Sequence, residues 1–343
     1  KCEKVERRVL TVEEQRIFLD YLAQNKSWYE ELYKFMLLTG LRIGEVGGLQ
    51  WEDIDFSNRF IYVKRTLSYQ YEDGKKTMRL TMLGTGNALV TEVYNTCFVI
   101  ENENQYLLVD GGGGSEILKR LKDAKISIAD IHHIFVTHKH IDHILGIVWM
   151  TRIICQNMQK GAYEGDAYIY GHEEVISLIQ ELSEKLLQKK QTDFIGKRVH
   201  LVVVTDGEEK EIIRKKVTFF DIHSTKAKQF GFCMELEEGQ KLTCCGDEPY
   251  CDWEEKYAKG SKWLLHEAFC LYGQRDTFHP YEKNHSTVKD ACELAEKLGV
   301  ENLILYHTED KNIKARKALY TEEGKAYYHG NLYVPDDMEE FEL

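Results

Sequence analysis

The sequence has no run of about 18 apolar residues, which is the length of a membrane-spanning helix, so we expect no membrane span. It also lacks C-x-x-C spacing, and its nine cysteines are scattered. An odd number of cysteines without a disulfide framework is typical of free thiols in a reducing compartment. The N-terminus, Lys1–Lys4, is charged and has no apolar core of a signal peptide. We therefore expect a cytoplasmic protein, and the absence of an initial Met suggests a fragment or a processed product.

Basic charge is also scarce, because 45 Lys and Arg face 57 Asp and Glu, a net charge of −12. Residues 1–78 are balanced in charge, so the acidic excess belongs to the residues that follow. Such a balance is unfavourable for broad binding to a phosphate backbone, which relies on Lys and Arg. The net charge does not show where basic residues gather, so it does not exclude a local basic groove.

The length of 343 residues fits one large domain or two ordinary ones. Thr11 and Glu14 form a capping box, which predicts a helix through Leu22, and a second helix is expected over 28–38. The polar, Gly-containing segment 71–76 reads as a turn or linker. We expect a small, mainly helical segment over 1–78 and a second domain over 79–343.

From residue 79 onward, strands and helices alternate in the manner of an α/β (α+β) fold. We expect strands over 79–84, 96–100, 105–109, 131–137, 199–204, 217–223, 231–236, 241–245 and 303–306, and helices over 115–124, 143–158, 173–189, 288–298 and 315–329. The acidic tail, 336–343, is expected to be an edge or frayed.

Four potential metal ligands follow the apolar stretch 131–137 in an H-x-H-x-D-H run: His138, His140, Asp142 and His143. Lone histidines are usually ordinary core or surface residues, but nothing structural requires four such side chains within six positions. The run would lie on the loop at the carboxyl end of a strand, where α/β folds place their chemistry. It therefore predicts a metal site.

Three further candidates each follow an apolar strand: His223, Asp247 and His307. The alternative for any one of them alone is a structural role. Together they would converge on one rim of a layered sheet. Imidazoles and carboxylates suit zinc, which tolerates four or five ligands and leaves room for water.

On these residues, with Gly84-Thr85-Gly86 and Asp110-Gly111, residues 79–343 resemble the metallo-β-lactamase superfamily. The resemblance implies a four-layer αββα sandwich with two metal ions, usually zinc, with manganese or iron as alternatives. It implies that one ion is bound by His138, His140 and His223 and the other by Asp142, His143 and His307, and that Asp247 bridges them. Two such ions hold a bridging hydroxide that attacks phosphorus.

Two further motifs resemble ribonuclease Z: Leu265-His266-Glu267-Ala268-Phe269 and Asn284-His285-Ser286-Thr287. By this resemblance, His285 protonates the leaving oxygen, His266 and Glu267 support it, and Asp142 belongs with them to the catalytic set. The alternative for His285 is a structural place at a helix N-terminus. A homodimer is implied by the resemblance alone.

The chain departs from ribonuclease Z in two places. That family usually carries a basic Gly-Pro-rich arm for tRNA, whereas the three prolines here are Pro249, Pro280 and Pro335, outside the corresponding insertion. In the insertion, a charged helix with Lys185, Lys189 and Lys190 reads as a solvated face. Thr308-Glu309-Asp310 replaces a serine and a basic residue, and acidic groups there would repel a phosphate backbone.

Residues 10–75 resemble the front of a tyrosine recombinase (integrase) catalytic domain, through Leu37–Glu45 and Leu49–Asp55. The resemblance implies that Arg42 is a remnant of a DNA phosphate clamp; the alternative is a helix-start arginine paired with Glu45. Neither a later H-x-x-R box nor a tyrosine nucleophile follows in context. Without them strand cleavage cannot proceed, so we expect no recombinase activity.

Three hypotheses follow from the sequence. The first is a binuclear hydrolase of the ribonuclease Z kind, a phosphodiesterase whose substrate could be RNA. The second keeps the site but acts on a small ester, a cyclic phosphodiester or a thioester. The third is a DNA-binding recombination accessory protein that acts through residues 1–78.

Overall fold

The structure, a computed structural model, describes residues 11–24, 30–41, 46, 49, 53–56, 58–63, 77–237 and 239–343. The chain divides into two compact units, Lys1–Lys75 and Lys76–Leu343. No helix within the described ranges is long and apolar enough to cross a membrane. Arg42 and the expected linker over 71–76 lie outside the described residues.

In the first unit, helix α1 (Val12–Gln24) begins at the expected capping box. The backbone N–H of Thr11 donates to the Glu14 carboxylate at 2.8 Å, and the N–H of Glu14 donates to Thr11 Oγ1 at 3.2 Å. Helix α2 (Glu30–Thr39) contacts α1 through an edge-to-face pair of Phe18 and Tyr33, with ring centroids 5.3 Å apart. A short hairpin joins β1 (Ile54–Asp55) to β2 (Phe60–Ile61).

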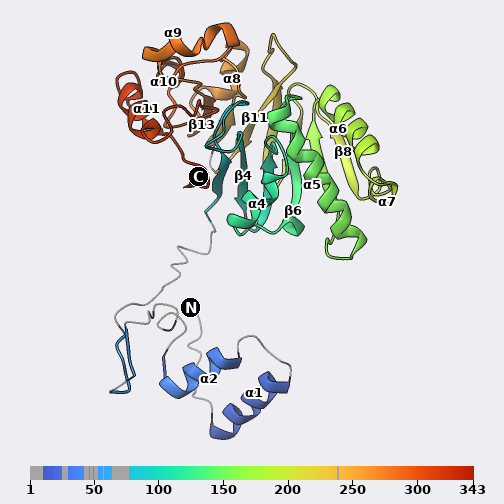
Figure 1. Ribbon diagram of the computed structural model, residues 1–343, viewed down its shortest axis with the longest axis vertical. Helices are drawn as coiled ribbons and strands as arrows, with labels where there is room; N and C mark the ends of the chain where they lie inside the picture. Colours follow the sequence, from blue (N-terminus) through green and yellow to red (C-terminus); the bar gives the residue numbers. More distant parts are fainter. Residues whose placement is uncertain are drawn as a thin grey trace. The chain divides into compact units, whose positions relative to one another are not determined.

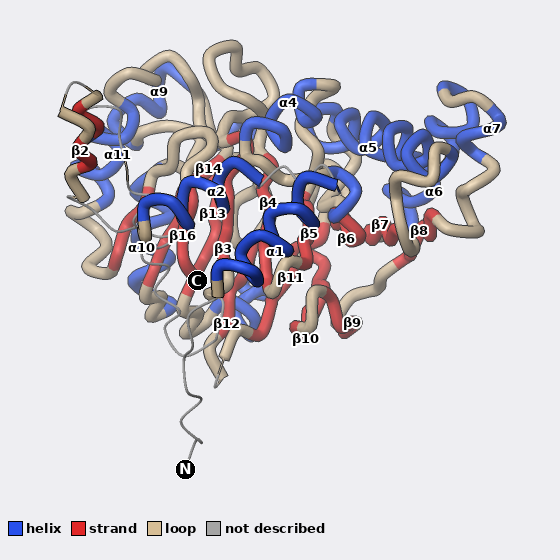
Figure 2. Tube along the Cα trace, turned by 90° about the horizontal axis from the view of Figure 1, so that it is seen from below, coloured by secondary structure: helices blue, strands red, loops and turns tan. Residues whose placement is uncertain are grey.

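The second unit is built on two seven-stranded sheets (Figures 1 and 2). The first has the order β16-β3-β4-β5-β6-β7-β8, and the second β15-β14-β13-β12-β11-β10-β9. The strands of the first sheet are β3 (Arg79–Gly84), β4 (Cys97–Asn102), β5 (Gln105–Val109), β6 (Ile131–Phe135), β7 (Ala167–Gly171), β8 (Val199–Val203) and β16 (Glu340–Glu342). Those of the second are β9 (Glu209–Ile212), β10 (Lys215–Asp221), β11 (Phe230–Glu235), β12 (Lys241–Cys244), β13 (Trp263–Glu267), β14 (Asn302–Tyr306) and β15 (Asn331–Tyr333).

Helices cover the outer face of each sheet. The helices over the first sheet are α4 (Glu116–Asp123), α5 (Ile141–Gln159), α6 (Glu173–Leu186) and α7 (Lys189–Thr192). Those over the second are α8 (Glu255–Ala258), α9 (Arg275–Phe278), α10 (Val288–Leu298) and α11 (Arg316–Gly324). The predicted αββα layering is therefore confirmed.

The inner faces of the two sheets meet in an aromatic core. Phe135 of β6 packs against Phe219 of β10 and Phe232 of β11, with ring centroids 4.8 and 5.8 Å apart. All three rings are buried. Burial of three large apolar side chains at the centre stabilises the contact between sheets by several kcal/mol, at roughly 25 cal/mol per Å² of apolar surface.

The strand directions decide where functional side chains gather. Strands β5 and β6 run parallel to each other, and so do β12, β13 and β14. Parallel strands place their carboxyl ends at one edge of a sheet. The loops after these five strands therefore supply a common rim.

Several elements differ from the expected ones. The short strands β7, β9, β13 and β15 were not predicted as such, and α11 ends at Gly324 rather than near residue 329. All five residues of β13 are buried, so the run has no period-2 alternation to mark it as a strand. The acidic tail forms the edge strand β16, where Phe341 pairs with Leu80 of β3.

Candidate metal centre

The H-x-H-x-D-H run connects β6 to α5. His138 follows the strand, His140 is the N-cap of α5, and Asp142 and His143 belong to its first turn. His138, Asp142 and His143 are 0%, 4% and 1% exposed. The change from strand to helix within a few residues turns these side chains toward the same rim. The negative charge of Asp142 is favourable there, because backbone N–H groups are unpaired in a first helical turn.

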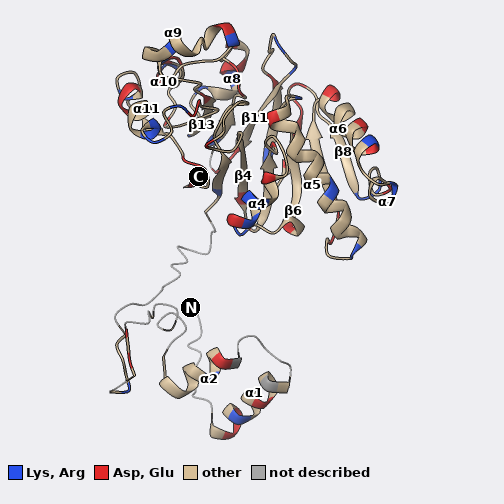
Figure 3. Cartoon of the chain, viewed as in Figure 1, with Lys and Arg blue, Asp and Glu red and all other residues tan. Residues whose placement is uncertain are grey.

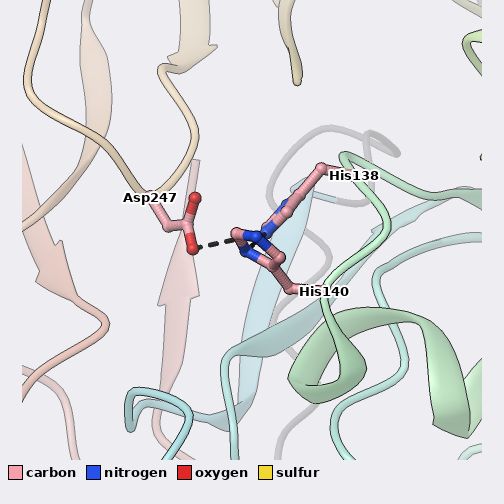
Figure 4. A group of neighbouring side chains, drawn as sticks. All are labelled: His138, His140 and Asp247. Carbon is pink, nitrogen blue, oxygen red and sulfur yellow. Dashed lines mark hydrogen bonds and ion pairs between the residues drawn. The ribbon is translucent and has the colours of Figure 1, made fainter. Parts of the chain in front are cut away.

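Asp247, after β12, reaches the same point from the second sheet (Figure 4). Its Oδ2 lies 3.5 Å from His138 Nε2 and 3.3 Å from both His143 Nε2 and His307 Nε2. His140 Nδ1 lies 2.8 Å from His138 Nε2. One carboxylate oxygen is thus surrounded by imidazole nitrogens from β6, α5 and the end of β14.

These side chains form two groups whose ligand atoms lie within 4.8 Å of one another. The first is His138, His140 and Asp247, and the second is Asp142, His143 and His307. The Nε2 atoms of His143 and His307 are buried and have no hydrogen-bond partner. Buried polar nitrogens without a partner are costly, and a divalent cation would provide one. The donor set therefore fits a metal, and its imidazole and carboxylate chemistry suits zinc.

The structure places His223 outside both groups. Its ring is exposed and packs beside Trp253, with ring centroids 5.2 Å apart. Its backbone has φ 56°, and its N–H donates to Asp221 Oδ1 at 2.8 Å. The assignment of His223 as a metal ligand therefore stays a prediction.

Asp110, directly after β5, orients His143 and Thr137 through hydrogen bonds. Its Oδ2 accepts hydrogen bonds from His143 Nδ1 and Thr137 Oγ1, both at 2.8 Å, and its Oδ1 accepts the Thr137 N–H at 2.9 Å. The bond to Nδ1 fixes the His143 tautomer that leaves Nε2 free for a metal. From sequence, Asp110-Gly111 contributes only to the superfamily resemblance and has no assigned role. The available signal was an acidic residue directly after a buried strand.

Gln229 is a second residue that the sequence did not single out. It is 1% exposed, and its Nε2 donates to Asp247 Oδ1 at 2.6 Å. This bond leaves Oδ2 of the same carboxylate directed at the imidazoles. No spacing signal marks Gln229, because its partner comes from another strand.

The protonation tendencies of the cluster follow from its charges. Burial opposes ionisation of Asp142 and Asp247, but the neighbouring imidazoles outweigh burial and hold the pKa of both carboxyls below the ordinary value. Burial lowers the pKa of His138. Burial also acts against a charged His143, but Asp142 and Asp110 outweigh it and raise the pKa of His143. The centre thus favours anionic carboxylates, the form required of metal ligands.

A third group combines Glu267, His285 and His307. His285 stacks on Phe269, with centroids 5.0 Å apart, and its Nδ1 lies 3.6 Å from Glu267 Oε2. Burial opposes charge on His285, but Glu267 outweighs it and raises the pKa of His285. His266 does not join this group: its buried Nδ1 bonds to the Glu267 carbonyl at 2.8 Å, and burial lowers its pKa.

A cavity of about 550 Å³ opens over the centre. It is lined by Ala88, Lys139, His140, Ile141, Asp142, Lys226, Asp247, Glu248, His285 and His307. The volume lies within the range of small-molecule sites. Two of the lining side chains are lysines, which are suited to an anionic substrate.

The acidic residues that follow His307 are buried, and their expected repulsion of a phosphate backbone stays a prediction. Glu309 and Asp310 are 3% and 6% exposed. Asp310 Oδ2 accepts the Glu92 N–H at 3.0 Å and also that of Thr91, and Glu309 accepts the N–H of Asn312. Their carboxylates therefore hold neighbouring loops in place.

Helices α6 and α7, which include the lysines expected to form a solvated face, carry ion pairs between residues close in sequence. Lys185 pairs with Glu181 on α6, and Lys189 pairs with Asp193 at 3.1 Å. Figure 3 shows acidic and basic positions side by side along α6 and α7. These exposed pairs are worth little to stability, and they offset part of the basic charge in this region.

The αββα sandwich and its rim of histidines and aspartates define the metallo-β-lactamase fold. The crystal structure of the metallo-beta-lactamase fold protein YhfI from Bacillus subtilis matches with a TM-score of 0.64 and 17% identity, over 78% of this chain and 99% of that one. Human tRNase Z, short form, matches with a TM-score of 0.58 and 21% identity, over 77% and 98%. The predicted fold class is confirmed.

Residues 78–327 match the family model described as Anti-Pycsar protein Apyc1, and the chain belongs to this family. The ribonuclease Z of Thermococcus sibiricus is 26% identical over 306 residues, which cover 76% of this chain and 95% of the relative. The phage integrase family model matches residues 8–140. The predicted resemblances to ribonuclease Z and to an integrase fragment are both supported.

Proposed function

We propose that this protein is a binuclear metal-dependent phosphodiesterase that hydrolyses a small, cyclic or otherwise compact, phosphodiester. The observation that carries the proposal is the position of Asp247 Oδ2, which lies 3.3–3.5 Å from three imidazole nitrogens. The ribonuclease Z relatives support a metal-dependent hydrolase of phosphodiesters. Zinc as the ion, and two ions per site, are part of this proposal.

Two divalent ions at this centre would activate a water molecule and stabilise charge on the phosphate oxygens. The protein itself supplies the other requirements. His285 faces the cavity beside His307, with ring centroids 5.2 Å apart, and Glu267 favours its protonated form. A departing alkoxide needs a proton, which the imidazolium of His285 donates as the P–O bond breaks. Lys139 and Lys226 line the cavity and add positive charge near the anionic substrate, while Lys139 pairs with Glu174 at 3.0 Å and the Lys226 ammonium donates to the Lys283 carbonyl.

The size of the cavity favours a compact substrate over a long RNA. A volume of about 550 Å³ lies within the range for small-molecule sites. The net charge of −12 disfavours extended contacts to a phosphate backbone. RNA cleavage is the second candidate, because the ribonuclease Z relatives are matched over nearly their whole length.

The test compares substrates on the zinc-loaded 343-residue chain. Bis-p-nitrophenyl phosphate, cyclic nucleoside monophosphates and a precursor tRNA are offered to the wild type and to His285→Ala. Cleavage of small diesters without tRNA cleavage supports the proposal, whereas tRNA cleavage alone supports the second candidate. Failure to bind metal, or turnover of none of the three, would refute the proposed function. The homodimer and the cytoplasmic location expected from the sequence stay predictions.

The segment before residue 76 keeps its predicted role as an inactive integrase fragment. Salt-dependent DNA binding by the full chain would instead favour a recombination accessory protein. The assignment of 1–78 and 79–343 as separate functional parts is likewise a prediction.

A further inference from the structure

Glu248, the residue after Asp247, connects three loops around the cavity. Its side chain lines the cavity but is only 5% exposed. Glu248 Oε1 accepts a hydrogen bond from Ser224 Oγ, and Glu248 Oε2 accepts one from Asn284 Nδ2, both at 2.8 Å. Each carboxylate oxygen is therefore bonded to a different loop.

The two partners stand next to residues that the proposed chemistry needs. Ser224 follows the predicted ligand His223, and Asn284 precedes the predicted proton donor His285. Asn284 has φ 56°, a left-handed backbone that non-Gly residues seldom adopt, and ends the 3₁₀ turn η5 (Tyr281–Lys283). A side-chain anchor at this position holds the turn from which the His285 backbone departs.

Other bonds brace the same two loops. Ser224 Oγ also accepts the N–H of Lys226 at 3.2 Å and that of Ala227 at 3.3 Å. The Lys226 ammonium donates to the carbonyl of Lys283, which crosses from one loop to the other. Glu248 is therefore the junction of a small network and not an isolated contact.

We propose that Glu248 is a positioning residue, which ties the loop of Ser224 to the loop of Asn284 and thereby fixes His285 over the reacting phosphate. The inference rests on the proposed function. Its carboxylate is hydrogen-bonded to Ser224 and Asn284, not to His223 or His285, and so acts through the two loops. Charge-assisted hydrogen bonds are roughly twice as strong as neutral ones, which makes a buried carboxylate an effective tie.

Loss of this tie has a consequence that general destabilisation does not have. Displacement of a catalytic group by about 1 Å can cost on the order of 100-fold in rate. If the displaced group is His285, only reactions whose leaving group needs a proton will suffer. A p-nitrophenolate leaving group departs without being protonated, whereas an alkoxide leaving group must receive a proton.

The experiment uses the zinc-loaded 343-residue chain and two diesters of one nucleoside 5′-phosphate, the p-nitrophenyl and the methyl ester. The variants are Glu248→Ala and Asn284→Gly, in which glycine keeps the positive φ and removes only the side-chain tie. We expect kcat to fall about 10- to 100-fold on the methyl ester and less than about threefold on the p-nitrophenyl ester. Glu248→Gln, which can rearrange its bonds to both partners, should recover most of this loss.

The control is Glu282→Gln, which removes one carboxylate from the same turn. Glu282 is exposed and lies 3.4 Å from His279, away from the tie, so both esters should be cleaved as by the wild type. A second readout needs no activity: in urea unfolding of the metal-free protein, the effects of Glu248→Ala and Asn284→Gly should be less than additive.

The outcomes separate this inference from the proposed function. If the wild type cleaves neither ester, the proposed function fails. If the wild type cleaves both but the variants lose equal activity on each, or none, Glu248 does not position His285. If Glu248→Ala does not fold, Asn284→Gly alone decides by the same ratio.

Discussion

Asp110→Asn should weaken metal binding without removing any ligand. Asp110 accepts three hydrogen bonds at 2.8–2.9 Å, two from Thr137 and one from His143 Nδ1. An asparagine oxygen can still accept the Thr137 N–H, but its NH₂ group then faces His143 Nδ1. That nitrogen must become an acceptor, so the imidazole proton moves to Nε2, which lies 3.3 Å from Asp247 Oδ2. A metal must then displace this proton.

The expected loss of zinc affinity is about 10- to 100-fold, as for other partners that orient a metal-bound imidazole. It corresponds to about 1.4–2.8 kcal/mol. The assay titrates zinc into metal-free protein against a competing chromophoric chelator. Asp166→Asn is a matched control, because Asp166 Oδ2 also bonds a histidine, His200 Nε2, at 3.0 Å, in a partly exposed pair outside both ligand groups. An unchanged zinc affinity in Asp110→Asn, or an equal loss in the control, would refute the reasoning.

Three further outcomes are expected. Gly146→Ala should lower the free energy of unfolding in urea by about 1–3 kcal/mol, because its Cβ would lie 1.8 Å from the Gly111 carbonyl oxygen, whereas Gly114→Ala, with open space around its Cβ, should change little. The pKa of His285 is raised, so its favourable protonation is complete at low pH and is lost as pH rises through that pKa. In the methyl-ester assay, kcat should therefore fall on the alkaline side, and Glu267→Gln should move the fall to lower pH; an unmoved profile contradicts the role of Glu267. Zinc at 100 times its dissociation constant should stabilise the folded protein by about 2.7 kcal/mol, seen as a higher Tm that EDTA reverses.

The fold could be predicted because the local sequence pattern is enough to identify most of its main strands. Runs such as 131–137 and 303–306 are apolar, short and followed by polar residues, and the structure forms β6 and β14 there. Glu209–Ile212, by contrast, has alternating charges and becomes strand β9 only because β10 pairs with it, Lys215 opposite Ile212. Tertiary pairing, rather than intrinsic preference, decides such edge strands.

In the candidate site, too, the sequence identifies some of the residues and misses others. Candidate metal ligands such as His138 and Asp142 could be proposed from sequence because their residue types are informative and they follow a strand closely. Thr137, between them and the strand, contributes through its backbone N–H and hydroxyl, and its role depends on Asp110, 27 residues earlier in the chain. A carboxylate that orients a ligand looks, in sequence, like any aspartate after a strand.

The position of Asp247 depends on residues that no local pattern connects. Gln229 lies 18 residues before it and holds one carboxylate oxygen, while the imidazoles of His138, His143 and His307 approach the other from two different sheets. Sequence could assign Asp247 to the rim, because it follows a strand. It could not assign which oxygen faces the imidazoles, since that choice is made by the buried amide of Gln229, directly before the neighbouring strand β11. The contacts that orient this centre, Gln229 to Asp247 and Asp110 to His143, join segments next to paired strands, β11 with β12 and β5 with β6, so they are found only once those strands are paired.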